Sequence, residues 1–164
     1  MGGSIWVESE YKRGSNFIFE IPGKTNLPKE SATKIINIPA LDHLNILVAE
    51  DEESNFLYLE EILEAYNINI HRAKNGQEAL NILKEHPDID LILMDIKMPV
   101  MNGLEATKAI KKLFPDIPVI AQTAYATPED KKNAKMAGCD DYLVKPIQRS
   151  TLIETMDNYF NFEK

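Results

Sequence analysis

Short apolar runs alternate with segments of helical periodicity along residues 41–164 of this chain. The runs predict strands near residues 45–49, 69–73, 90–94, 118–122 and 141–144, because uninterrupted apolar runs of this length suit strands buried on both faces. Between the runs, apolar positions recur at helical spacing and predict helices that begin near Ser54, Asn75, Asn102, Thr127 and Gln148. Five strand–helix units in alternation predict an α/β fold with a parallel sheet covered by helices on both faces.

The first forty residues follow a different pattern. Apolar and polar positions alternate in residues 4–21 around a turn-like segment at residues 10–15, which predicts a β-hairpin. Residues 22–40 have the composition of a linker, with three prolines and scattered Lys, Ser and Thr. We therefore expect a hairpin in residues 1–22, a linker in residues 23–42 and one domain in residues 43–162.

Four of the buried runs lead into residues that phosphate and magnesium chemistry uses. These residues are Glu50 and Asp51, then Asp95, Thr123 and Lys145. The carboxyl ends of parallel strands face a common crevice, so we expect the five side chains to converge there. Clustered carboxylates repel one another unless a cation intervenes, and oxygen ligands favour Mg²⁺. Asp95 is then a candidate nucleophile toward phosphorus, while Thr123 and Lys145 are candidates to contact a phosphoryl oxygen.

The same residues lie in motifs that resemble response-regulator receiver domains. The matching pieces are residues 46–55, residues 94–103, residues 118–124 and Lys145-Pro146, in the order and spacing of that family. The resemblance covers about residues 43–162. It implies a flavodoxin-like, doubly wound (βα)5 fold with strand order 2-1-3-4-5. It also implies a phosphoacceptor in a two-component phosphorelay, with Mg²⁺ as its cofactor.

Roles for individual residues follow from this resemblance by position. Asp95 would be the phosphoacceptor, and Glu50, Asp51, Asp95 and the backbone carbonyl of Lys97 would hold Mg²⁺. Glu50 stands where many members have Asp, and it keeps a carboxylate on the metal or its water.

The resemblance also assigns residues around the acceptor. Thr123 and Lys145 would contact the phosphate, and Tyr142 would act with Thr123 as the switch pair. The Lys145–Pro146 bond is expected to be cis. Lys97 and Tyr125 occupy positions where the family tunes phosphoryl lifetime, and a bulky Tyr125 predicts slow autodephosphorylation.

Residues 2–10 and 14–22 resemble the closing strands of a histidine-kinase ATP-binding domain, although Lys12 replaces a glycine that is common in the turn. The order of hairpin, linker and receiver implies part of a hybrid sensor histidine kinase. Because the ATP-holding segments are absent, we expect no nucleotide binding by this chain. The expected partners are a histidine kinase core or a histidine phosphotransfer protein. With Trp6, Phe17 and Phe19 uncovered, the hairpin is expected to be disordered, to dock on the receiver, or to pair in a homodimer.

Composition and charge restrict the partners and the cellular location that we expect for the protein. The formal net charge is -8, with +1 in residues 1–40 and -9 in residues 41–164, so binding to nucleic acid by phosphate neutralisation is not expected. The single cysteine, Cys139, excludes an internal disulfide and is interpreted as a packing residue. No apolar stretch approaches the roughly 20 residues that span a bilayer. We expect a cytoplasmic chain without direct membrane contact, and leave open whether a parent kinase is membrane-anchored.

Two other functions compete with a phosphoacceptor. A receiver-like binding module that is never phosphorylated would lack the acceptor, the threonine or the lysine, and this chain has all three. An Mg²⁺-dependent phosphatase with an aspartyl nucleophile would need a second acid two residues after Asp95, where Lys97 stands. His43, His71 and His86 lie far apart in the sequence and are interpreted as surface or packing residues.

Overall fold

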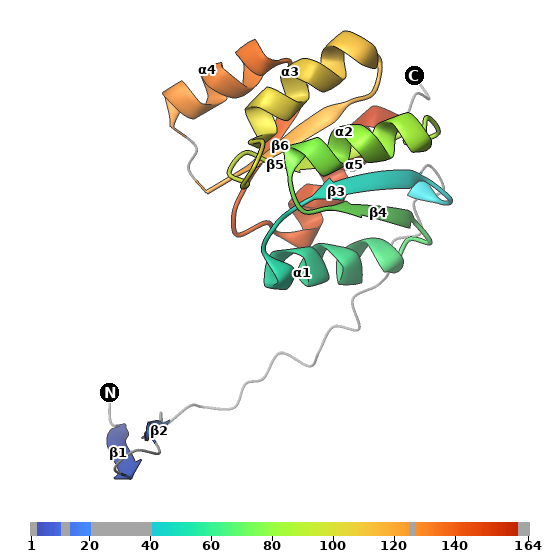
Figure 1. The fold of residues 1–164 in the computed structure, drawn as a ribbon. Helices are drawn as coiled ribbons and strands as arrows, with labels where there is room; N and C mark the ends of the chain where they lie inside the picture. The colour runs from blue at the N-terminus through green and yellow to red at the C-terminus, as the bar shows by residue number, and fades with distance from the viewer. Residues whose placement is uncertain (1–2, 11–13, 21–40, 125–126, 161–164) are drawn as a thin grey trace. The chain divides into compact units, whose positions relative to one another are not determined.

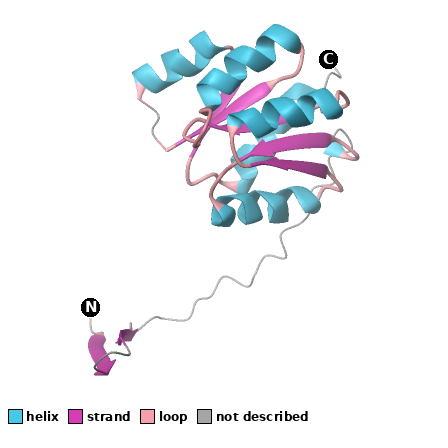
Figure 2. Cartoon of the chain, in the orientation of Figure 1, coloured by secondary structure: helices cyan, strands magenta, loops and turns pink. Residues whose placement is uncertain are grey.

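The computed structural model describes residues 3–10, 14–20, 41–124 and 127–160. The chain divides into two compact units, Met1–Lys34 and Ile35–Lys164, drawn in Figures 1 and 2. Most of the linker expected at residues 23–42 lies outside the described residues. The two units are considered separately.

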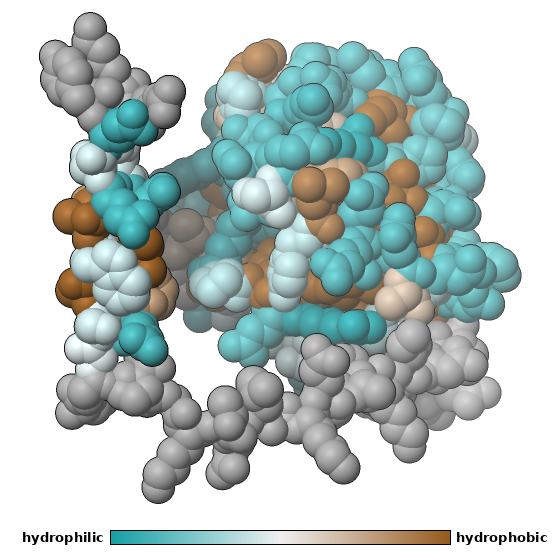
Figure 3. Space-filling view, turned by 90° about the horizontal axis from the view of Figure 1, so that it is seen from below, coloured by the Kyte–Doolittle hydropathy of each residue, from teal (hydrophilic) through white to brown (hydrophobic). Residues whose placement is uncertain are grey.

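The first unit contains the predicted hairpin. Strands β1 (Ser4–Glu10) and β2 (Gly14–Glu20) pair antiparallel. Ile5 lies opposite Phe19, and Val7 lies opposite Phe17, so these four side chains share one face of the hairpin. All four are more than half exposed, and Figure 3 shows apolar side chains gathered along the hairpin. The hairpin therefore presents an apolar face to solvent.

The second unit is built on a five-stranded parallel sheet. Its strands are β3 (Asn45–Ala49), β4 (Asn69–Ala73), β5 (Leu91–Asp95), β6 (Val119–Thr123) and β7 (Asp141–Val144). Their spatial order is β4-β3-β5-β6-β7, which is 2-1-3-4-5 within the domain, so the predicted flavodoxin-like fold is confirmed. Strands β5 and β6 end one residue later than predicted. As a result Asp95 and Thr123 are themselves held in the sheet, aligned with Gln122 and Val144.

Four helices connect these strands and a fifth follows β7, all close to where the sequence predicts them. They are α1 (Glu53–Glu64), α2 (Gly76–Glu85), α3 (Gly103–Leu113), α4 (Pro128–Ala137) and α5 (Arg149–Phe160). Asn75, Asn102 and Thr127 cap α2, α3 and α4, each accepting a hydrogen bond from a first-turn N–H. Gly138 ends α4 at a φ of 99°, the left-handed conformation that favours glycine. No helix in the described ranges is long and apolar enough to cross a membrane.

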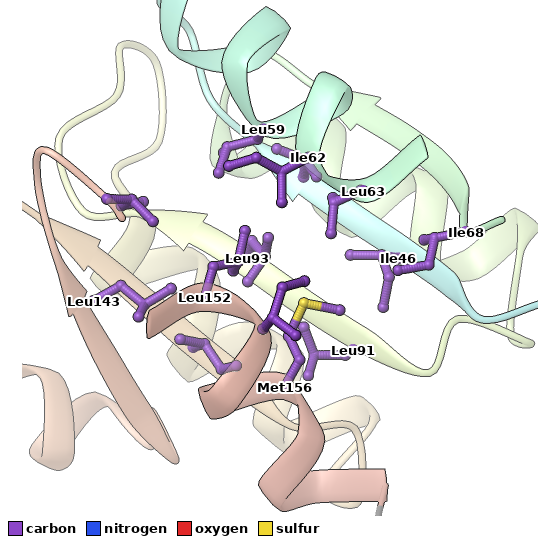
Figure 4. Close-up of a cluster of buried hydrophobic side chains, with 14 of the residues drawn as sticks. Ile46, Leu59, Ile62, Leu63, Ile68, Leu91, Leu93, Leu143, Leu152 and Met156 are labelled. Carbon is purple, nitrogen blue, oxygen red and sulfur yellow. The ribbon is translucent and has the colours of Figure 1, made fainter. Parts of the chain in front are cut away.

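The helices cover the two faces of the sheet and bury one apolar cluster on each. Figure 4 shows one cluster between the sheet and helices α1 and α5, to which Leu63 and Met156 contribute from the helices and Leu93 from the sheet. The other cluster packs α2 and α3 against the opposite face, where Leu83 and Ile110 are fully buried. Burial on both faces fixes the strands, and so fixes the positions of the polar residues that end them.

Candidate functional site

The polar residues that end the strands gather at the carboxyl edge of the sheet. β3 lies between β4 and β5, so the chain leaves β3 toward one side and later returns on the other. This reversal of strand order creates the crevice in which doubly wound proteins bind ligands. Glu50 and Asp51 follow β3 directly, and Asp95 is the last residue of β5.

Three carboxylates form the acidic part of the site. Glu50, Asp51 and Asp95 each place a carboxylate oxygen within 4.8 Å of the others. Glu50 and Asp95 are buried, whereas Asp51 is exposed. Three oxygen donors this close, with one open to solvent, fit a hard divalent cation such as Mg²⁺.

The Lys145 ammonium lies between the two buried acids. Its Nζ is 2.6 Å from Glu50 Oε2 and 2.6 Å from Asp95 Oδ2. Burial of this ammonium opposes its charged form, but its hydrogen bonds to the Asp95 and Glu50 carboxylates outweigh that cost and raise the pKa of Lys145. Lys145 is therefore a fixed positive charge that joins β7 to the ends of β3 and β5.

Backbone and side-chain amides hold the other oxygens of these carboxylates. Glu50 Oε1 accepts hydrogen bonds from the Glu52 N–H and from Asn55 Nδ2, at 3.3 and 3.1 Å. Asp95 Oδ1 accepts one from the Lys97 N–H, at 3.0 Å. The start of α1 and the loop after β5 thus fix the orientation of both buried acids.

Gly103 at the start of α3 allows a close approach to Asp95. A Cβ at this position would lie 2.8 Å from the carbonyl carbon of Asp95 and closer still to its oxygen. The Gly103 N–H also donates to the Ile96 carbonyl at 3.0 Å. A side chain here would force α3 away from the end of β5, so only glycine fits without displacing the Asp95 backbone.

The structure brings Thr123 to the same edge but places Tyr142 toward α4. Thr123 is buried at the end of β6, and its carbonyl accepts from the Lys145 N–H at 2.8 Å. Tyr142 is half-buried on β7, and Lys131 Nζ lies 4.6 Å from the centre of its ring. The Lys145–Pro146 bond is cis, as expected. Tyr125 lies outside the described residues.

The structure shows three features that the sequence pattern does not predict: a contact of Asn55, the burial of Gln122, and a contact between two histidines. Asn55 positions Glu50, and its place in the first turn of the first helix was the available signal. Gln122 is a buried amide that follows three apolar residues of β6. His71 and His86 are in ring contact, with centroids 4.4 Å apart, although fifteen positions separate them in the chain.

Comparison with known proteins agrees with the fold and the site. Residues 46–157 match the response regulator receiver domain family. The chain belongs to this family. The polar-differentiation response regulator DivK of Brucella anthropi is 40% identical over 117 residues, which cover 70% of this chain and 94% of that protein. A second DivK, from Brucella ovis, is 39% identical over the same length.

Solved structures are similar in the same region. One is a chain from the co-crystal of the Saccharomyces cerevisiae histidine phosphotransfer protein Ypd1 with the receiver domain of Ssk1. It aligns with a TM-score of 0.68 and 34% sequence identity, and the alignment covers 73% of this chain and 90% of that chain. Another comes from the CheX–CheY–BeF3–Mg complex of Borrelia burgdorferi. It aligns with a TM-score of 0.68 and 28% sequence identity, and the alignment covers 71% of this chain and 89% of that chain. The protein is a receiver-domain phosphoacceptor, and its acidic triad is typical of a receiver Mg²⁺ site.

Proposed function

We propose that Asp95 accepts a phosphoryl group from a phosphohistidine on a partner protein. The observation that supports this choice is the environment of its carboxylate. Asp95 ends the central strand β5 and is buried except for 7% of its surface. One of its oxygens is held by the Lys97 N–H and the other contacts the Lys145 ammonium. The carboxylate is therefore oriented before it reacts.

The transfer exchanges one bond to phosphorus for another. The phosphoryl group leaves the imidazole nitrogen as an Asp95 oxygen bonds to phosphorus, and the electron pair of the broken N–P bond stays on the imidazole. Lys145 carries the positive charge nearest to the acceptor oxygen, and it pairs with the phosphoryl oxygens that arrive there. Thr123, buried at the end of β6, offers its hydroxyl to the same group.

A magnesium ion fits the triad and is proposed as the cofactor of this transfer. Glu50, Asp51, Asp95 and the backbone carbonyl of Lys97 would hold it. When bound, Mg²⁺ neutralises charge on the phosphoryl oxygens. Lys145 forms ion pairs with both Glu50 and Asp95 at the place where the ion would bind.

We further propose that Thr123 and Tyr142 transmit the phosphorylated state to the surface. The Thr123 carbonyl is bonded to the Lys145 N–H, so a shift of Thr123 toward phosphate moves the end of β7. Tyr142 stands on β7 beneath Lys131 of α4. The face formed by β7 and α4 would then change shape on phosphorylation.

The donor is proposed to be a histidine phosphotransfer protein or a histidine kinase core. The similar Ssk1 receiver was crystallised with such a phosphotransfer protein, Ypd1. In residues 1–22 the hairpin would be the end of a kinase ATP-binding domain, followed by a linker to residue 42 and the receiver in residues 43–162, as in a hybrid sensor histidine kinase. The exposed apolar face of the hairpin suits burial against the rest of such a domain.

In this chain the same apolar face is also proposed to pair two copies. Ile5, Val7, Phe17 and Phe19 would be buried between the two hairpins. Replacing Phe17 and Phe19 by serine should shift the chain to monomer in analytical ultracentrifugation. An unchanged mass distribution would eliminate the pairing.

The donor class can be tested by transfer from a histidine phosphotransfer protein carrying labelled phosphate on its histidine. We expect label to move to the wild-type chain and to Asp116→Asn, a control at an exposed aspartate away from the triad, but not to Asp95→Asn. Transfer that survives in Asp95→Asn would overturn the assignment of the acceptor. Labelling by a small phosphodonor without labelling by any phosphohistidine protein would overturn the donor class alone.

A further inference from the structure

His71 and His86 form a pair that the fold brings together. Their ring centres lie 4.4 Å apart, and the ring planes are tilted by 44°. His71 lies in the middle of β4, and His86 is the residue that ends α2. Both residues are partly exposed, so solvent and dissolved ions can reach the pair.

The backbone holds both histidines in place. His71 is aligned in the sheet with Leu47 of β3, and Leu47 is buried in the cluster that α2 and α3 cover, so His71 lies on the same face of the sheet as α2. The His86 N–H donates to the Ile82 carbonyl at 2.8 Å, and the His86 carbonyl accepts from the Ile89 N–H. The pair therefore joins an edge strand of the sheet to the end of a helix.

The charges around the pair suit a cation. Burial and the neighbouring His86 lower the pKa of His71, against the opposing charge of Asp88, so the His71 imidazole is neutral at neutral pH, the form that ligates metals. Asp88 is exposed, and its negative charge attracts a cation bound beside it. The nearest cationic residue on β4, Arg72, lies over the Phe56 ring of α1, on the other face of the sheet.

The separation of the two rings suits imidazoles that share one metal ion. With metal–nitrogen distances of about 2.0–2.1 Å, two imidazoles at adjacent positions on one ion have ring centres about 4.5–5 Å apart. The observed 4.4 Å is close to this range, so binding calls for rotation of the rings rather than movement of the backbone. Imidazole nitrogen suits Zn²⁺ and Cu²⁺, whereas Mg²⁺ prefers oxygen ligands.

We propose that His71 and His86 together bind a divalent transition-metal ion of the class that prefers imidazole, Zn²⁺ or Cu²⁺. One nitrogen of each ring ligates the ion, and water completes its coordination. Asp88 adds electrostatic attraction. The bound ion clamps the edge strand β4 to the end of α2.

This site is separate from the acidic triad in position and in donor chemistry. Helix α2 leaves the carboxyl end of β4 and returns toward the amino edge of the sheet, where the Asp90 N–H donates to the Asn45 carbonyl at the start of β3. His86 therefore lies toward the edge opposite the triad. The triad offers three carboxylates and the pair offers two imidazoles, so binding at the pair does not depend on Asp95.

The test is a titration of Zn²⁺ into the ¹⁵N-labelled full chain in saturating Mg²⁺, which competes for oxygen sites. The ring nitrogens of each histidine are followed by long-range ¹H–¹⁵N correlation. We expect saturable shifts of the His71 and His86 ring nitrogens along one common binding curve, which His43, with its side chain 77% exposed, does not follow. Titration with Mg²⁺ alone should move neither ring, and Cu²⁺ should compete with Zn²⁺ for the pair.

Variants of the protein complete the test. His71→Asn and His86→Gln each remove a ligand and should weaken Zn²⁺ binding by more than about tenfold, since loss of an outer-shell partner alone costs about that much. His43→Gln and Asp95→Asn should bind Zn²⁺ at the pair like the wild type. The proposal is overturned if Zn²⁺ causes no saturable shift of the two rings, which would show that they only pack together. It is also overturned if His86→Gln keeps the wild-type affinity, or if Asp95→Asn abolishes the binding.

Discussion

Replacing Lys145 by methionine removes the ammonium but keeps most of the aliphatic stem. In the metal-free protein this leaves two acids without their cation, since Nζ lies 2.6 Å from both Glu50 and Asp95. The Glu50 side chain is 0% exposed and that of Asp95 is 10% exposed, so water cannot replace the lost partner fully.

The expected cost follows from this burial. Removing one partner from a buried ion pair typically costs about 3–5 kcal/mol. Glu50 and Asp95 keep hydrogen bonds from Asn55 and from the Lys97 N–H, which places the loss near the lower end, about 3 kcal/mol. A cation bound to the triad would supply the missing charge, so Mg²⁺ should stabilise Lys145→Met by about 1–2 kcal/mol more than it stabilises the wild type.

The assay is urea unfolding of each protein with EDTA and with saturating Mg²⁺. Lys111→Met is a matched control, because Lys111 Nζ lies 2.7 Å from Asp140 and the Lys111 side chain is 18% exposed, close to the 19% of Lys145. It should also lose stability, but equally with and without Mg²⁺. The reasoning fails if Lys145→Met is as stable as the wild type in EDTA, or if Mg²⁺ stabilises both to the same extent.

Three further changes test other parts of the account. Gly103→Ala should lower the free energy of unfolding by about 1–3 kcal/mol and slow phosphorylation, since the new Cβ would meet the Asp95 carbonyl; wild-type unfolding would contradict this. Val100 has a φ of 67°, a left-handed conformation that is strained for a branched side chain, and it is 87% exposed. Val100→Gly should raise the free energy of unfolding by about 0.5–1 kcal/mol, because the strain that is relieved exceeds the cost of the more flexible unfolded chain. A lower Tm would contradict this. Burial and the neighbouring His86 lower the pKa of His71, so the stability that neutral His71 contributes is present above its ordinary pKa and is lost as the pH falls through the lowered one. His71→Asn should therefore reduce the loss of stability between neutral pH and about pH 5, and an unchanged loss would contradict the assignment.

The residues that end the strands show which parts of the fold and the site can be predicted from the sequence. The apolar runs before Glu50 and Asp95 locate buried strands, and parallel pairing then requires their carboxyl ends to meet. Cap residues such as Asn102 locate the helix starts. The order and spacing of the motifs produce the resemblance to receiver domains. These signals are local, or depend only on the order of elements along the chain.

The sequence predicts that these distant residues converge, but it does not predict which side chains contact each other. Lys145 approaches Glu50 across 95 positions and Asp95 across 50, and only the sheet order determines that one ammonium meets both acids. The steric need for Gly103 arises from a single close approach to β5. Gln122 was visible as a polar residue after an apolar run, but its complete burial depends on how the helices pack on the sheet. Each of these is a property of packing.

The most direct test of the central claim is the intact mass of the protein after incubation with acetyl phosphate and Mg²⁺. The account predicts one phosphoryl adduct on the wild type and on Asp116→Asn, absent in Asp95→Asn and strongly reduced when EDTA replaces Mg²⁺. No adduct on the wild type, or an adduct that persists in Asp95→Asn, would contradict it.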